Sequence, residues 1–302
     1  MNKTVVVVVS ASLLLGACLA NAQSLEERVQ SYGKSYGTGY LQPFTDAFGA
    51  SLNSGWYSTA DVSNGISIYI GVKAMAMPIP DGSKSFSYAN PFGATDVVPT
   101  VFGDKTSKPV TNLPASLAGT PYSTYAPGFG VSFAPMFVPQ ISAGNIFGTR
   151  LILRYLPKVS LGGGYGEINF FGVGAQHSIS QYIPLVPLKI AAHVGYQNLS
   201  LGDFLTTSAF SIGAEASKSF AMFTVYGGVA YEKSTMSFSY TAKYVPQGQT
   251  AAIAEQFNFD IDGTNSVRAT LGFALSLGLI KINADYSLAS QPVACLGFGF
   301  GI

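Results

Sequence analysis

The chain has 302 residues, of which 10% are charged and 13% are aromatic, and its mean hydropathy is positive. Soluble domains usually carry about a quarter charged residues, so the composition argues against an ordinary soluble surface. The formal net charge is +1 and the basic residues form no cluster, which excludes an electrostatic basis for binding nucleic acid or anionic lipid. Cys18 and Cys295 are the only cysteines and provide neither a disulfide framework nor a cysteine-based zinc site.

The first 22 residues have the pattern of an export signal. Lys3 precedes an apolar stretch over residues 5–15, and Ala20-Asn21-Ala22 forms a small-x-small cleavage site. We expect a signal peptide over residues 1–22, because a membrane barrel gains little from an acyl anchor. Lipoprotein processing is the alternative, since Leu15-Gly16-Ala17-Cys18 resembles a lipobox.

Residues 23–55 form a segment of a different kind. Ser24 and Glu27 have the spacing of a capping box, which predicts a short helix. Four aromatic residues then follow at intervals of four: Tyr36, Tyr40, Phe44 and Phe48. We expect this segment to fold into a barrel lumen as a plug; a position across the periplasmic mouth is the alternative.

The remainder of the chain alternates apolar and polar residues with a period of two. Beyond residue 20 no apolar run reaches the roughly 18 residues of a membrane helix, which leaves a closed membrane barrel or a very apolar soluble β-protein. Alternating stretches of about the length of one tilted crossing occur at 66–77, 129–136, 149–156, 167–177, 188–199, 206–217, 221–232, 237–245, 267–277, 280–288 and 294–302. Pro, Gly, Ser and Asn interrupt the pattern over residues 80–148. We predict an all-β, antiparallel transmembrane barrel of 12–14 strands over residues 56–302, preceded by the helical plug.

Loop lengths predict an orientation for this barrel. If the last strand ends in the periplasm, residues 246–265 form a long loop outside the cell, and Gly278-Leu279 forms a tight periplasmic turn. Long external loops and short periplasmic turns are typical of outer-membrane barrels. The localisation that we expect is therefore the bacterial outer membrane.

The same alternation assigns charged side chains of both signs to the lumen. These predicted lumen-facing residues are Lys73, Arg150, Arg154, Lys189, His193, Glu215, Glu232, Arg268, Lys281 and Asp285. They either line a selective pore or pair with one another and close it. Both readings stay open at the level of sequence.

The chain offers little to a catalytic or metal-binding interpretation. His177 lies beside Ser178 and Ser180, but no serine-elbow signature accompanies it, and a polar residue such as His193 is what any barrel lumen requires. Residues 162–166 lack the Lys-Ser/Thr of a phosphate loop, and Glu255, Asp260 and Asp262 lack EF-hand spacing. We expect no enzymatic activity, cofactor, metal or nucleic-acid partner.

Three stretches carry a resemblance to a known family: AFGASLNSGWYSTA (47–60), PMFVPQISAGNIFGTRLILRYLP (135–157) and GVGAQHSISQYIP (172–184). They resemble a family of Bacteroidota outer-membrane proteins described only as a domain of unknown function. This resemblance implies a barrel and transfers no activity or ligand. The architecture is also distantly similar to long-chain fatty-acid transporter-type barrels, which have an N-terminal plug.

Two functions fit these expectations. The first is a passive channel or transporter for a small solute, with a hydrophobic or amphipathic cargo by analogy to those transporters. The second is a non-transporting barrel with a structural, adhesive or secretion-accessory role. Partners would be outer-membrane lipid and a small solute, and the sequence leaves the oligomeric state open.

Overall fold

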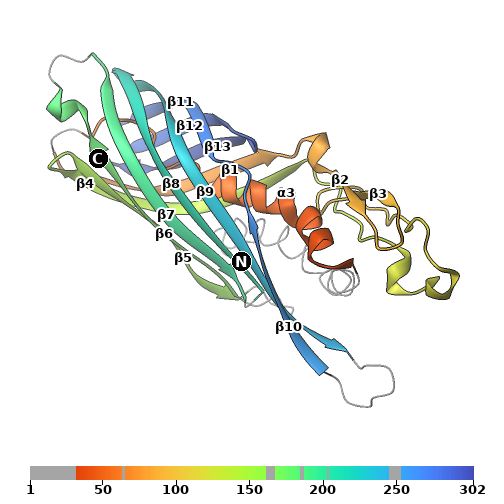
Figure 1. Cartoon of the computed structure of the whole chain (residues 1–302). Coiled ribbons are helices and arrows are strands. Elements are labelled where there is room, and N and C mark those ends of the chain that lie inside the picture. The colour runs from red at the N-terminus through yellow and green to blue at the C-terminus, as the bar shows by residue number, and fades with distance from the viewer. Residues whose placement is uncertain (1–31, 63–64, 161–166, 184–186, 203, 245–252) are drawn as a thin grey trace.

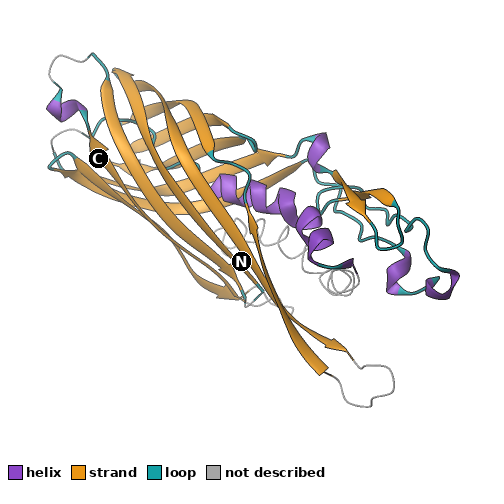
Figure 2. Ribbon diagram, viewed as in Figure 1, coloured by secondary structure: helices purple, strands orange, loops and turns teal. Residues whose placement is uncertain are grey.

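The computed structural model describes residues 32–302 except 63–64, 161–166, 184–186, 203 and 245–252. Ten antiparallel strands form a closed barrel, which Figures 1 and 2 show from the side. In order around the barrel they are β9 (Phe223–Tyr244), β11 (Val267–Leu277), β12 (Ile280–Leu288), β13 (Val293–Gly301), β1 (Ser67–Pro78), β4 (Phe133–Ile146), β5 (Thr149–Ser160), β6 (Glu167–Ser178), β7 (Lys189–Leu201) and β8 (Leu205–Phe220). Pairing of β8 with β9 closes the ring, and pairing of β1 with β13 joins the first and last barrel strands.

The two ends of the barrel differ in their connections. At one end, which we call the turn end, two-residue turns join β4 to β5, β8 to β9 and β11 to β12, a longer connection with η4 (Ser180–Tyr182) joins β6 to β7, and the C-terminus lies here too. Gly148 and Gly278 adopt positive φ in two of these turns, as tight hairpin turns require. At the other end, the loop end, β9 extends beyond the barrel and pairs with β10 (Ile253–Asp262) in a projecting hairpin (Figure 1).

The strand count is lower than the sequence predicted. The alternating stretches at 221–232 and 237–245 belong to one strand, β9, which pairs with β11 along its first part and with β10 along its second. The predicted external loop over 246–265 therefore contains a strand. Residues 79–132 add no strand to the barrel, because they form a separate small domain at the loop end. The count of 12–14 was wrong for these two reasons, whereas the barrel architecture is confirmed.

The outer face of the barrel is apolar around its whole circumference. Apolar side chains at alternate positions point outward, with exposures of 63% at Leu151, 60% at Val229, 69% at Leu271 and 61% at Leu296. Their partners in the alternation face the interior, where most polar and charged side chains of the barrel are buried. A continuous apolar belt over a polar interior is the arrangement of a transmembrane barrel.

The small domain contains η1 (Asp81–Ser83), β2 (Ser85–Ala89), β3 (Thr95–Pro99), η2 (Ala115–Leu117) and η3 (Pro121–Ser123). Its β2–β3 hairpin lies beyond the barrel wall, next to the start of helix α3 (Lys34–Leu52) (Figure 1). Aromatic side chains of the domain surround the first turns of that helix: the ring centroids of Tyr36 and Tyr88 are 5.3 Å apart, and those of Tyr36 and Tyr125 are 5.8 Å apart.

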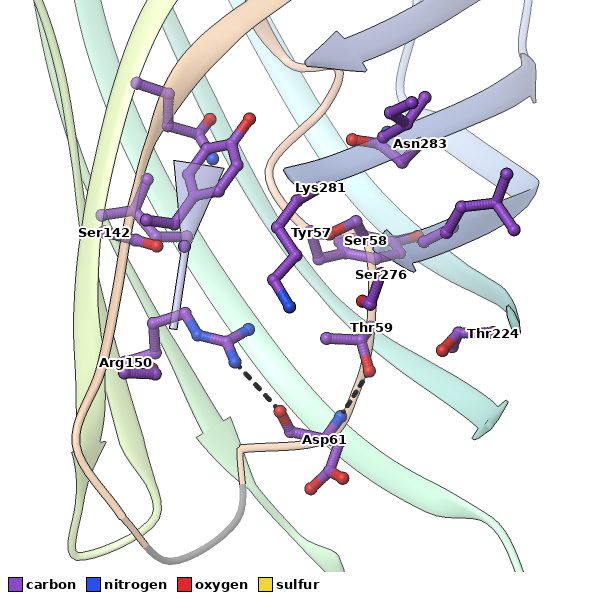
Figure 3. Close-up of a pocket in the computed structure, with 18 of the residues that line it drawn as sticks. Tyr57, Ser58, Thr59, Asp61, Ser142, Arg150, Thr224, Ser276, Lys281 and Asn283 are labelled. Atoms are coloured by element: carbon purple, nitrogen blue, oxygen red, sulfur yellow. Dashed lines mark hydrogen bonds between the residues drawn. The ribbon is translucent and has the colours of Figure 1, made fainter. Parts of the chain in front are cut away.

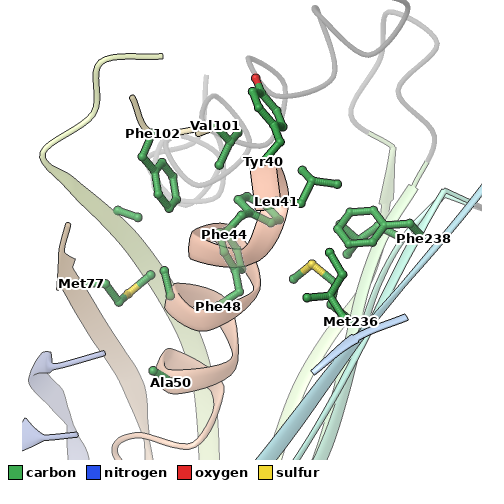
Figure 4. Close-up of a cluster of buried hydrophobic side chains, with 14 of the residues drawn as sticks. Tyr40, Leu41, Phe44, Phe48, Ala50, Met77, Val101, Phe102, Met236 and Phe238 are labelled. Atoms are coloured by element: carbon green, nitrogen blue, oxygen red, sulfur yellow. The ribbon is translucent and has the colours of Figure 1, made fainter. Parts of the chain in front are cut away.

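Helix α3 runs from this domain into the loop end of the barrel (Figure 1). The spacing of four places Tyr36, Tyr40, Phe44 and Phe48 on the buried side of the helix, with exposures of 5% or less. Phe44 and Phe48 contribute with other residues of α3 to the hydrophobic cluster of Figure 4, which also contains Met77, Met236 and Phe238 of the barrel wall and Phe102 of the small domain. This cluster fills the loop end of the lumen. The capping box at Ser24 and Glu27 lies outside the described residues. No helix in the described part of the chain is long and apolar enough to cross a membrane.

The chain continues through the lumen after the helix. Residues 53–62, which we call the lumen segment, pass from the end of α3 toward the turn end, where β1 begins. The lumen is thus occupied past the boundary that we expected at residue 55. Along its length the segment contacts positions on β5 that lie progressively closer to the turn end. The Ser54 carbonyl accepts a hydrogen bond from Arg154, and the Asp61 carbonyl accepts one from Arg150.

Candidate functional site

Two buried arginines hold the junction between helix α3 and the lumen segment. Arg154 on β5 donates from Nη1 to the Leu52 carbonyl (3.0 Å) and from Nη2 to the Ser54 carbonyl (2.7 Å). Arg268 on β11 donates from Nη2 to the Ala50 carbonyl (2.6 Å) and from Nη1 to the Ser54 hydroxyl. The last carbonyls of a helix lack partners within the helix and carry partial negative charge. The two guanidinium groups therefore satisfy and neutralise the C-terminal end of α3.

The two arginines have different counter-charges. Arg268 forms a two-point ion pair with Glu232 on β9, with Nε–Oε2 and Nη2–Oε1 distances of 2.7 and 3.2 Å. Arg154 instead bonds to Gln140 and Gln197 and lies 3.9 Å from the centroid of the Trp56 ring. A cation over an indole face is stabilised without a carboxylate. Trp56 is thereby fixed against the wall.

A second layer of hydrogen bonds holds the part of the lumen segment that is closer to the turn end. Gln176 donates to the Thr59 carbonyl and to Glu215 Oε1, both at 2.7 Å. Arg150 donates to the Asp61 carbonyl at 3.0 Å, and the Ala60 amide donates to the Ser217 hydroxyl at 2.9 Å. Most of these bonds end on main-chain atoms of the segment, so the wall recognises its backbone path more than its side chains.

Between the layer of Arg154 and Arg268 and the turn end, the lumen contains a cavity of about 270 Å³. Its inner end is bounded by Trp56, Lys73 and Gln140, and its outer end by residues at the turn end of the wall, including Ser67, Ser276 and Ile302. Figure 3 shows Arg150 and Lys281 extending from opposite sides into this space, with Tyr57 and Thr59 of the lumen segment beside them. The cavity therefore leads from the turn-end mouth to the lumen segment.

The structure places all of the predicted lumen-facing residues at the interior or its rim. Seven are buried in the interior: Lys73, Arg154, His193, Glu215, Glu232, Arg268 and Asp285. Arg150 and Lys281 line the cavity, and Lys189 lies at the rim with its Nζ 3.8 Å from the Asp61 carboxylate. The sequence left open whether these charges pair with one another or line a pore. Arg268 and Glu232 form such a pair, whereas Arg150 and Lys281 line the cavity.

The family of unknown function DUF6588 matches residues 1–302. The chain belongs to this family. The resemblance to a family of unknown function that the sequence carries is thereby confirmed, and no curated protein matches the chain.

Solved structures similar to this DUF6588 barrel are distant. The toluene transporter TodX of Pseudomonas putida is 12% identical, with 87% of this chain and 72% of that chain covered and a TM-score of 0.31. The attachment invasion locus protein Ail of Yersinia pestis is also 12% identical, with 79% and 99% covered and a TM-score of 0.26. OmpT, an outer membrane protein of Vibrio cholerae, is 9% identical, with 80% and 100% covered and a TM-score of 0.25.

Three residues of this DUF6588 chain have the connectivity of a catalytic triad. His193 Nδ1 lies 2.7 Å from Glu215 Oε2, and His193 Nε2 lies 3.3 Å from the Ser211 hydroxyl. The adjoining space is about 10 Å³, which is room for a single water molecule. Glu215 also accepts a hydrogen bond from Gln176, so the three side chains belong to the network that supports Gln176 and the lumen segment.

Sequence patterns identified the charged wall residues but missed their partners in the lumen segment. Trp56 lies against Gly174 on β6 and Gly195 on β7, which face each other in register. A Cβ at Gly174 or Gly195 would lie 2.7 or 2.5 Å from the indole ring. Paired inward glycines on neighbouring strands are the signal that would have predicted a large side chain entering from the lumen.

The other polar candidates from the sequence have structural partners. His177 Nδ1 lies 2.8 Å from the Thr149 hydroxyl and its Nε2 lies 2.9 Å from the Tyr182 hydroxyl. Asp262 accepts a bond from Thr235, and residues 162–166 lie outside the described part of the chain. Among the described residues, no group of three or more His, Cys, Asp or Glu side chains is placed to hold a metal ion.

Proposed function

We propose that this chain is an outer-membrane transporter of a small solute whose lumen is closed at rest by residues of its own N-terminal region. The observation that carries the proposal is the lumen segment. Eight-stranded barrels are just wide enough for side chains to fill, so ten strands enclose more space, and here a separate stretch of chain occupies it. The side chains of the wall do not fill this space by themselves, so movement of the lumen segment would open a path through the lumen.

The apolar belt and the asymmetry of the ends support the membrane and the orientation in this proposal. Outer-membrane barrels have short turns in the periplasm and longer connections outside the cell. On this basis the turn end, with the cavity mouth, faces the periplasm, and the small domain with the β9–β10 hairpin faces the exterior. The proposed transport needs no covalent step and no cofactor.

A native cysteine offers a direct way to lock the lumen segment. A Cβ at Gly55 would lie 3.0 Å from the Cys295 Sγ on β13, close to the separation that the bond lengths of a disulfide require. Gly55→Cys would therefore crosslink the segment to the wall under oxidising conditions. Gly55 has a φ of +71°, so the substitution costs on the order of 1–3 kcal/mol of strain, and folding should be checked first.

The test is flux of small radiolabelled solutes into liposomes that contain the Gly55→Cys protein. We expect flux under reducing conditions and its loss after oxidation, with return on addition of dithiothreitol. Gly55→Cys combined with Cys295→Ala is the matched control and should conduct under both conditions. Equal flux of the locked and reduced proteins would contradict gating by the lumen segment.

A second function is favoured by the contacts of helix α3 at the loop end. The Tyr88 hydroxyl donates to the Tyr32 carbonyl at 2.6 Å, the Ala126 amide donates to the Tyr36 hydroxyl at 2.9 Å, and the Tyr40 hydroxyl donates to the Pro127 carbonyl at 2.7 Å. The same helix is thus anchored in the barrel and in the small domain. This arrangement suits a rigid scaffold that presents the small domain outside the cell. The absence of flux in both the wild-type protein and the reduced Gly55→Cys protein would favour this scaffold function over transport.

A further inference from the structure

The cavity beside the lumen segment contains more cationic than anionic side chains. Lys73, Arg150 and Lys281 line it, and Asp61 is the one acidic side chain among its described lining residues. The Asp61 carboxylate lies 3.8 Å from Lys189 Nζ at the rim, so a fourth cation partly offsets its charge. An anion in the cavity would therefore meet an excess of positive charge.

None of the three lining cations forms an ion pair with a described carboxylate, and Lys73 Nζ donates to the Asn283 Oδ1 at 2.6 Å. Lys281 Nζ has neither a hydrogen bond nor an ion pair with any described residue, although the side chain extends into the cavity (Figure 3). Arg150 uses two nitrogens on neutral oxygens, the Gln176 side chain at 2.8 Å and the Asp61 carbonyl at 3.0 Å. Charged donors form their strongest hydrogen bonds with anionic oxygens, so both groups have unused binding capacity.

The cavity also offers a neutral donor and an apolar surface. The Tyr69 hydroxyl is buried and has no hydrogen-bond partner among the described residues, and this residue lines the same space. Trp56, Tyr57 and Ile152 supply aromatic and aliphatic surface. Apolar walls with a few convergent polar groups are typical of small-molecule sites.

We propose that this cavity binds a small organic carboxylate with an apolar body. The carboxylate would lie between Lys281 and Arg150, and the body would pack toward Trp56 and Tyr57. The volume of about 270 Å³ accommodates a ligand of the size of an aromatic acid. This inference deepens the proposed transport function, because the ligand would be the solute held beside the lumen segment.

The probe is benzoate, with benzamide as a neutral ligand of the same shape. Binding to the full mature chain in detergent would be measured by isothermal titration calorimetry. Charge-assisted hydrogen bonds are stronger than those to a neutral amide, so we expect benzamide to bind at least tenfold more weakly than benzoate. Equal affinities would overturn the proposal.

The variant is Lys281→Met, which removes the charge from a side chain that forms no hydrogen bond or ion pair with a described residue and so should leave folding intact. We expect at least a tenfold loss of benzoate affinity. Lys158→Met is the matched control, because Lys158 is exposed at the loop end and lies 3.8 Å from Glu167. Unchanged affinity in Lys281→Met, or an equal loss in both variants, would overturn the site. Benzoate binding without liposome flux would contradict transport alone, whereas flux of other solutes without benzoate binding would contradict this site alone.

Discussion

Arg154 and Arg268 approach the end of helix α3 from strands that lie five positions apart in the ring of ten, and thus from opposite sides of the barrel. Each is buried, with an exposed fraction of 0% and 3% respectively. A buried charge is costly unless hydrogen bonds satisfy it, and here half of the hydrogen bonds that the two guanidinium groups donate end on residues 50–54 of the N-terminal region. The interior charges and the lumen segment therefore stabilise each other.

At this scale we predict the effect of Arg268→Met. The substitution leaves the Glu232 carboxylate buried without its cation, which should lower the free energy of unfolding by about 3–5 kcal/mol. Urea unfolding of the protein in lipid vesicles measures this change. The double variant with Glu232→Gln removes the orphaned charge and should recover part of the loss. Lys158→Met changes an exposed site and is the control, for which we expect the unfolding free energy to fall by less than about 1 kcal/mol. If Arg268→Met were as stable as this control, the role of Arg268 would be contradicted.

The strands account for the membrane-facing surface, because their alternation assigns each side chain a side. Leu271 lies near the middle of β11 with 69% exposure, whereas Leu279 lies in the turn between β11 and β12 with 60% exposure. We predict that Leu271→Arg lowers the unfolding free energy by about 2–4 kcal/mol and Leu279→Arg by about 0–1 kcal/mol, since the cost of a charge depends on its depth in the bilayer. Equal costs in lipid vesicles would contradict the position of the belt.

Local alternation predicted the C-terminal strands closely, including the turn at Gly278 and the inward positions of Arg268 and Asp285. It divided β9 in two, because a period of two carries no information about which neighbour a strand pairs with. It found no strand over residues 80–128, since that part of the small domain is held by non-local aromatic contacts such as Tyr36 with Tyr125, and it began the stretch at 129–136 four residues before β4 starts. The main-chain partners of Arg154, the Leu52 and Ser54 carbonyls, were beyond reach for the same reason, because no side-chain pattern reveals a carbonyl acceptor.

At the scale of the whole molecule, one continuous N-terminal element joins three parts. Helix α3 packs on the small domain at its start and fills the loop end of the barrel with Phe44 and Phe48 (Figures 1 and 4). It then leads into the lumen segment, which lines the cavity. Displacement of the lumen segment would therefore be coupled to the helix and to the small domain outside the barrel. A signal received at the loop end has a physical route to the cavity through this element.

The fluorescence of Trp56 tests the position of the lumen segment most directly, because it is the only tryptophan of the chain and has an exposed fraction of 3%. The protein would be inserted into vesicles and titrated with acrylamide, a water-soluble quencher, and in parallel assembled with brominated lipids, which quench from the bilayer. We predict weak quenching by both, because Trp56 is stacked on Arg154 inside the wall. Strong quenching by acrylamide would mean that the segment lies in water outside the lumen, and strong quenching by brominated lipid would mean that it lies on the outer face. Either result would contradict a lumen closed by the N-terminal region.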